Sequence, residues 1–151
     1  MKKILVCLDG SPRAKHVLDS GLALAKLTGA KVVLFRSIGL PPAMPAHVWA
    51  LEEGNLLDAL RHDAERYLGE CASHVPPESL AGTSTALGVP WQAVCDEARE
   101  KDVDLIVIGS HGYSAIDKIL GTTAAKVVNH ADRSVLIVRS KHPAEFTASS
   151  A

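Results

Sequence analysis

Glycines and threonines near the carboxyl end of the chain have the spacing of a phosphate-binding loop. A short apolar run over residues 105–108 ends at Gly109, and Gly112 follows closely. Gly121 then precedes Thr122 and Thr123, where the sequence predicts a helix start. Glycine lets a backbone approach a ligand closely, and a helix start offers free N–H groups at the positive end of a dipole. The pattern favours nucleotide phosphate as the ligand.

The same residues also fit a purely structural interpretation. Tight turns after buried strands favour glycine, and Thr is a good cap for any helix. Three known loops are excluded by the residues themselves. No Gly-Lys-Ser/Thr is present for a Walker A loop, and no third close glycine completes the GxGxxG fingerprint. The order Gly109-Ser110-His111-Gly112 also differs from the GxSxG nucleophile elbow.

Catalysis at this loop is a second possibility, with His111 as the candidate general base. No carboxylate is placed to orient His111, and Ser110 has no assignable acid–base partner. The segment from Gly109 to Gly112 also lacks a lysine, arginine or carboxylate that could assist phosphoryl transfer. We therefore assign no catalytic residue and expect at most slow ATP hydrolysis or autophosphorylation. The seven histidines and three cysteines form no metal-ligand spacing, so we expect no metal held by side chains.

Length and composition narrow the class of protein. The 151 residues suit one domain, which we place at residues 1–140, followed by a disordered tail over 141–151. With 16 basic and 17 acidic residues, neither nucleic acid nor a membrane surface is an expected partner. Cys7, Cys71 and Cys95 are scattered and odd in number, which indicates a reducing, cytoplasmic compartment.

Strand-like and helix-like segments alternate along the chain. Continuous or short apolar runs predict strands over residues 3–8, 31–37, 83–87, 105–108 and 134–139. Helices are predicted from Ser11-Pro12 to a stop at Gly29, over 48–73, over 91–100, and from Thr122, with a proline-rich loop at 39–45. Trp49, Tyr67 and Trp91 are assigned to the core because they lie at helical spacing from apolar residues.

Such alternation predicts a parallel sheet with helices on both faces. Ligands bind these sheets at the carboxyl ends of strands, where the strand order reverses. If the first and fourth strands flank that point, Asp9 faces the loop from Gly109 to Gly112. Periodicity leaves the strand order open.

Taken together, several segments resemble the ATP-binding branch of the universal stress protein family. The carriers are the run ending in Leu8-Asp9-Gly10-Ser11, Gly88-Val89-Pro90, Asp104 to Gly112, Gly121-Thr122 and the apolar strand from Ser134. The resemblance extends from Lys3 to about Arg139. It implies an open, Rossmann-like five-stranded sheet of order 3-2-1-4-5, and a stress-responsive regulatory dimer that binds ATP with Mg²⁺ on the phosphates.

The resemblance also implies roles for individual residues. Asp9, with Leu8 beside it, would contact the adenosine, the backbone near Ser37 would meet the adenine edge, and Gly109 would lie against the ribose. The phosphates would be held by Gly112, Gly121, Thr122 and Thr123, and Ser110 and His111 complete the predicted set. Eight residues separate Gly112 from Gly121, one fewer than in the family signature.

Family members commonly form homodimers through the last strand, and this chain is expected to do so, with a further protein partner that the sequence does not name. Two alternatives stay open. One is a slow ATPase or autophosphorylating enzyme. The other is the branch of the family that binds no nucleotide and serves as a dimeric interaction module.

Overall fold

The structure is a computed structural model that describes residues 1–39, 46–110 and 120–139, with the backbone alone for 46–55. Within these residues, strands and helices alternate as the sequence predicts. The elements in chain order are β1 (Lys3–Cys7), α1 (Ala14–Thr28), β2 (Lys31–Ile38), α2 (Ala46–Ala72), the short 3₁₀ turn Pro77–Ser79, β3 (Leu80–Leu87), α3 (Pro90–Glu100), β4 (Leu105–Gly109), α4 (Thr122–His130) and β5 (Ser134–Val138). The predicted tail over 141–151 and most of the proline-rich loop lie outside the described residues.

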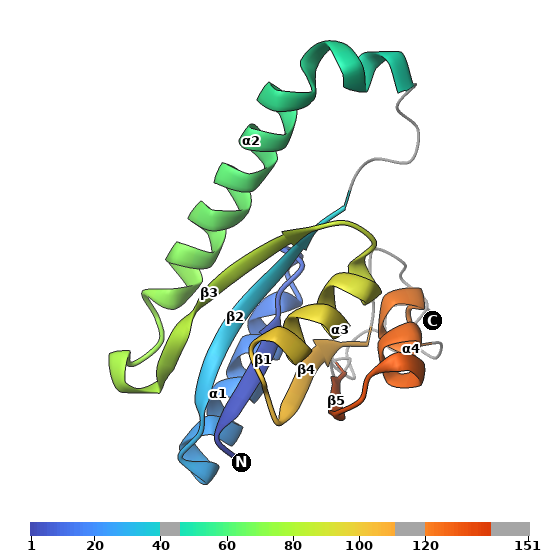
Figure 1. The fold of residues 1–151 in the computed structure, drawn as a ribbon. Helices are drawn as coiled ribbons and strands as arrows, with labels where there is room; N and C mark the ends of the chain where they lie inside the picture. Colours follow the sequence, from blue (N-terminus) through green and yellow to red (C-terminus); the bar gives the residue numbers. More distant parts are fainter. Residues whose placement is uncertain (40–45, 111–119, 140–151) are drawn as a thin grey trace, which may run out of the picture.

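The described strands form one parallel sheet of order β3-β2-β1-β4-β5, which confirms the predicted fold (Figure 1). Central strand β1 pairs on one side with β2, where Ile4 is opposite Val32, and on the other with β4, where Ile4 is opposite Leu105. The strand order reverses between β1 and β4. Sheets of this kind bind ligands beyond the carboxyl ends of the strands at that point.

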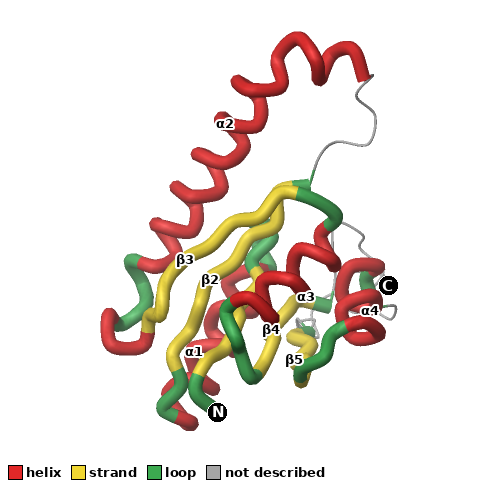
Figure 2. Tube along the Cα trace, viewed as in Figure 1, coloured by secondary structure: helices red, strands yellow, loops and turns green. Residues whose placement is uncertain are grey.

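Helices cover both faces of the sheet, as Figures 1 and 2 show. Consecutive strand residues point to opposite faces, so Val6 packs in the core beneath α1, whereas Leu5 packs in the core beneath α3 and α4. Helix α2 contributes Leu68 to the same core as α1. Because both faces are covered, the central strands are continuously apolar, and Ile4, Leu5 and Val6 are completely buried.

Helix α1 begins later than the sequence predicts. The expected start was Ser11-Pro12, but α1 begins at Ala14, after a turn. The Asp9 side chain accepts a hydrogen bond from the Ser11 backbone N–H (2.9 Å), and Gly10 adopts a φ of +76°. The Ser11 carbonyl then accepts from the Ala14 N–H (3.0 Å). An Asx-type turn therefore replaces the expected cap and lengthens the loop between β1 and α1.

Two aromatic residues lie at the margin of the core, not inside it. Trp91 is half-buried and stacks on His130 with ring centroids 4.5 Å apart, which joins α3 to α4. Tyr67 is also half-buried and lies beneath the guanidinium of Arg36. The prediction that these two rings are core residues is therefore only partly correct. Each ring is half-buried and contacts a polar side chain. The Trp49 side chain lies outside the described residues.

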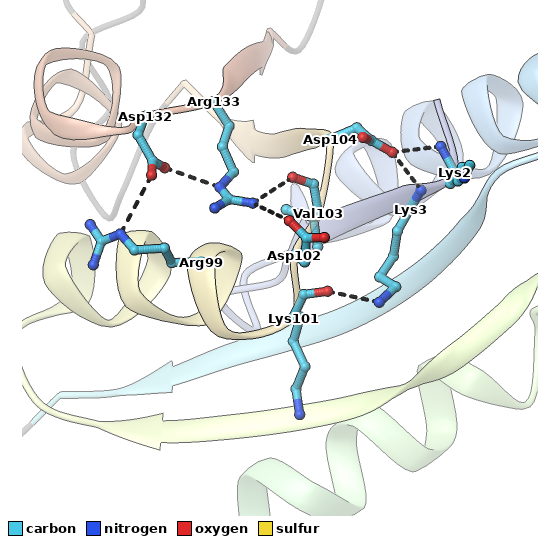
Figure 3. A network of polar contacts seen from close by, with 9 residues as sticks. All are labelled: Lys2, Lys3, Arg99, Lys101, Asp102, Val103, Asp104, Asp132 and Arg133. Carbon is cyan, nitrogen blue, oxygen red and sulfur yellow. Dashed lines mark hydrogen bonds and ion pairs between the residues drawn. The ribbon is translucent and has the colours of Figure 1, made fainter.

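A polar network closes the amino-terminal end of the sheet, opposite the carboxyl ends of the strands (Figure 3). The Asp104 carboxylate accepts hydrogen bonds from the backbone N–H groups of Lys2 and Lys3, which join the start of β1 to β4. These bonds hold the pKa of Asp104 below its ordinary value. At this end of the sheet, the charged Asp104 side chain therefore anchors β1 to β4.

Arg133 joins the next two turns in the same network. Its guanidinium donates to Asp132 (3.0 Å), to the Val103 carbonyl (2.9 Å) and to Asp102 (3.4 Å). Asp132 also pairs with Arg99, as Figure 3 shows. The Nε of Arg99 lies 3.5 Å from Oδ2 of Asp132. The turn before β4 is thereby fixed to the turn before β5.

Candidate functional site

A cavity of about 480 Å³ opens at the carboxyl ends of β1, β2 and β4. This volume lies within the range of roughly 300–1,000 Å³ that is typical of small-molecule sites. Five of the predicted site residues line it: Leu8, Asp9, Ser37, Gly109 and Thr123. Residues from three separate strands and from α4 are therefore brought to one place by the strand order that periodicity left open.

The Asp9 turn forms one part of the cavity wall. The Asp9 carboxylate is exposed and accepts the Ser11 N–H, so the turn fixes its position. Ser11 also lines the cavity, and its buried Oγ has no hydrogen-bond partner among the described residues. Buried hydroxyls normally have a partner. A ligand or an ordered water at this turn would supply the missing bond.

The start of α4 forms another part of the wall. Gly121 is the N-cap residue, and it supplies no side-chain hydrogen bond to the first turn. Thr123, within that turn, lines the cavity. The first N–H groups of a helix have no partner within the helix, and they attract anions together with the helix dipole. This part of the cavity suits a phosphate or carboxylate.

Other predicted residues occupy different positions. Ser110 is buried, its N–H donates to the Val138 carbonyl (2.9 Å), and its own carbonyl accepts from the Gly121 N–H (2.7 Å). Ser110 thus holds the start of α4 against β4. Gly121 and Thr122 lie at the helix start without lining the cavity. His111 and Gly112 lie outside the described residues, as does most of the eight-residue spacer before Gly121.

Sequence reasoning missed two cationic residues in the cavity wall. Arg13, at the N-cap of α1, and Arg36, near the end of β2, both line the cavity, together with the carboxylates of Asp9 and Asp63. Arg36 could have been noticed, because it directly follows the apolar run from Val32 to Phe35. Arg13 carried no comparable signal, since a polar residue is ordinary in the first turn of the helix predicted from Ser11-Pro12.

The floor of the cavity is apolar, and its thiol is not ionised. Phe35, Val94 and Ile108 contribute side chains, and Cys7 lies beside them. Burial, with smaller contributions from Cys95 and Glu97, raises the pKa of the Cys7 thiol far above its ordinary value. The thiol is therefore neutral at pH 7 and behaves as a small apolar group, as the sequence predicts. An apolar floor with polar groups at the rim suits a flat ring with polar edges.

Comparison with known proteins identifies the family. The model of the universal stress protein family matches residues 1–139. The chain belongs to this family. Universal stress protein A homolog 1 of Coxiella burnetii is 30% identical to it over 141 residues, which are 93% of this chain and 97% of that protein. The resemblance to the universal stress protein family is thus confirmed.

Solved structures agree in fold along nearly the whole chain. The structure of the hypothetical protein MJ0577 aligns with a TM-score of 0.78 at 25% identity, covering 94% of this chain and 98% of that one. A universal stress protein from Archaeoglobus fulgidus, in complex with dAMP, aligns with a TM-score of 0.63 at 22% identity, covering 92% of this chain and 98% of that one. No helix within the described ranges is long and apolar enough to cross a membrane.

Proposed function

We propose that this universal stress protein binds ATP in the cavity and acts as a nucleotide-responsive regulator. The observation that carries the proposal is the convergence of Asp9, Ser37 and Gly109 with the start of α4 around one cavity of about 480 Å³. The universal stress protein from Archaeoglobus fulgidus, which has the same fold, was solved in complex with dAMP. That complex supports a nucleotide as the ligand class. ATP is the nucleotide that the resemblance to the ATP-binding branch implies.

The arrangement suggests how the ligand would lie. Asp9 and the backbone at Ser37 belong to the β1 and β2 side of the cavity, where they would meet ribose and base. Gly109 and Thr123 belong to the β4 and α4 side, where uncapped N–H groups favour the phosphates. Gly112, Gly121 and Thr122 would complete that side, and Mg²⁺ would be carried by the phosphates.

We further propose a homodimer formed through β5. This strand is at the end of the described sheet and pairs there only with β4. Its Leu136 side chain is 36% exposed, and Val128 on the neighbouring α4 is 47% exposed. An open strand edge beside exposed apolar side chains favours pairing with a second chain, and a twofold axis satisfies both copies at once.

A reducing cytoplasm is the compartment that we propose for this dimer. Cys7, Cys71 and Cys95 are all free thiols, and Cys95 is buried in α3. A nucleotide-dependent change in conformation would then be transmitted to a protein partner that the structure does not identify.

The test is thermal unfolding of the wild-type protein with and without millimolar Mg-ATP. At a ligand concentration one hundred times the dissociation constant, binding adds about 2.7 kcal/mol to the free energy of unfolding. Gly121→Val is the matched variant, since the backbone at Gly121 (φ −57°) accepts any side chain. The family resemblance implies that Gly121 contacts the phosphates, so the added bulk should block their approach. We expect the gain in the wild type and its loss in the variant. No shift in the wild type contradicts the proposal.

A further inference from the structure

Arg36 is a charged residue that directly follows four buried apolar residues of β2, Val32 to Phe35. Its neighbours in β2 include Phe35, which is completely buried, and Ile38, which is 6% exposed. Arg36 itself is half-buried and lines the cavity. Withdrawing a charge from water is unfavourable unless a partner replaces the lost hydration. The half-buried guanidinium therefore needs a partner that replaces its lost hydration.

Two contacts fix the guanidinium in place. Its Cζ lies 4.8 Å from the centre of the Tyr67 ring, over the ring. On another side, Cζ, Nη1 and Nη2 are all 3.0–3.1 Å from the point where a Cβ on Gly10 would stand, so the flat group lies over the Gly10 backbone. The Gly10 contact uses the face of the planar cation, because Cζ and both Nη atoms are about equally far from that point. The N–H groups project within that plane and remain as donors.

Tyr67 provides a stable surface for this cation. Burial and the neighbouring Cys71 raise the pKa of Tyr67 to about 12, although the Arg36 charge acts in the opposite direction. The phenol is consequently neutral throughout the physiological range, and the stack is independent of pH there. This contact joins helix α2 to Arg36 of β2.

Arg36 also differs from other arginines of this protein in its partners. Arg66, Arg99 and Arg133 each form an ion pair with an aspartate. Within residues 1–39, 46–110 and 120–139, the Arg36 side chain forms neither an ion pair nor a hydrogen bond. A fixed, donor-only group at a cavity wall is what a site needs for reading an acceptor on its ligand.

The strand order indicates which part of the ligand Arg36 meets. Arg36 belongs to β2, whereas the start of α4 follows β4, and β1 lies between these two strands. Two strand spacings separate them, roughly 10 Å. If the phosphates bind at the start of α4, the opposite side of the cavity receives the nucleoside.

We propose that Arg36 is a ligand-binding residue that donates N–H hydrogen bonds to acceptor atoms of the nucleoside, its guanidinium held in place by Tyr67 and Gly10. The inference rests on the proposed nucleotide binding and names a contact beyond the predicted set. Purine ring nitrogens and ribose oxygens are the acceptors available on this part of the ligand.

Calorimetric titration of ATP and of adenosine into four proteins tests this assignment. The proteins are wild type, Arg36→Met, Arg36→Lys and Tyr67→Phe. Arg36→Met keeps the length of the side chain and removes the donors, so it should weaken both ligands by the same factor, about tenfold or more. Arg36→Lys keeps the charge without the planar group, and should weaken both ligands equally by a smaller factor. Tyr67→Phe keeps the ring and should bind like the wild type.

The outcomes separate this inference from the proposed function. If the wild type binds neither ligand, nucleotide binding fails and the role of Arg36 fails with it. If the wild type binds both and Arg36→Met binds both equally well, only the role of Arg36 is refuted. A loss for ATP with no loss for adenosine would place Arg36 at the phosphates and also refute it. Should Arg36→Met fail to fold, as judged by circular dichroism, the equal loss expected for Arg36→Lys decides the question.

Discussion

Gly21 allows α1 to approach β1 closely, and a methyl group added there should destabilise the protein. A Cβ at this position would stand 2.6 Å from Cγ2 of Val6 and 3.5 Å from its Cγ1. Val6 is completely buried in the central strand. The contact is well below the optimum of roughly 3.5–4.0 Å for carbon atoms, so backbone or side chain must shift. Since α1 follows the Asp9 turn directly, its position on β1 also fixes the cavity wall.

The size of the effect follows from two opposing terms. Replacing Gly by Ala inside a helix stabilises it by about 1 kcal/mol where space is open. Overpacking in a rigid core costs about 1–3 kcal/mol, and this contact belongs at the upper end. The net expectation for Gly21→Ala is a loss of about 1–2 kcal/mol. For a chain of this length that corresponds to a melting temperature lower by about 2–8 °C.

Gly69 in α2 provides the matched control. It is exposed, and a Cβ there would meet nothing within 4 Å. Gly69→Ala should therefore raise the free energy of unfolding by up to about 1 kcal/mol. Both variants are compared with the wild type by thermal and urea unfolding. Val6→Ala, added to Gly21→Ala, should cost less than Val6→Ala alone, because the added methyl fills the space. If Gly21→Ala stabilises the protein as Gly69→Ala does, the close packing of α1 on β1 is refuted.

Three other predictions concern the two ends of the sheet and its edge. The backbone N–H groups of Lys2 and Lys3 lower the pKa of Asp104 in the folded protein. The ionised side chain therefore stabilises the fold above the unfolded-state pKa of about 3.9, and this stabilisation is lost as the pH falls through the lower folded-state pKa. Asp104→Asn should thus be less stable than wild type in urea at pH 7, with a difference that narrows below about pH 4; a constant difference contradicts this. At the other end, ATP should bind more tightly than GTP, and Asp9→Ala should weaken ATP without unfolding the protein, whereas equal affinities for the two nucleotides in calorimetry count against the placement of Asp9. At the edge, Leu136→Lys should convert a dimer into monomer or aggregate in light scattering, and a wild-type monomer at micromolar concentration refutes pairing through β5.

The sequence was sufficient for most elements because their signals are local. Continuous apolar runs fixed the central strands, and Gly29 ended α1 as expected, in a left-handed conformation with φ +73°. Strand order is a non-local property, and only the family resemblance supplied it. Helix α1 was predicted too early because the Asp9 side chain satisfies the Ser11 N–H and favours a turn over a helix.

The sequence predicted site residues that belong to a motif. It was less successful with residues whose roles depend on the packing of distant segments. Asp9, Ser37 and Thr123 belong to the family pattern, and they do line the cavity. Ser110 belongs to the same pattern, yet its backbone groups are used to join β4, β5 and the start of α4. The role of Arg36 depends on its contact with Tyr67, which is distant in sequence and is brought beside Arg36 by the packing of α2.

The central claim is that a nucleotide occupies the cavity at the carboxyl ends of β1, β2 and β4. The most direct test is an amide chemical-shift titration of the ¹⁵N-labelled wild-type protein with Mg-ATP. The account predicts the largest shifts at Asp9, Ser37, Gly109 and Thr123, which line the cavity, with little change at Asp104 and Arg133 in the network at the opposite end. No shifts at saturating ATP, or shifts centred on that opposite network, would contradict the account.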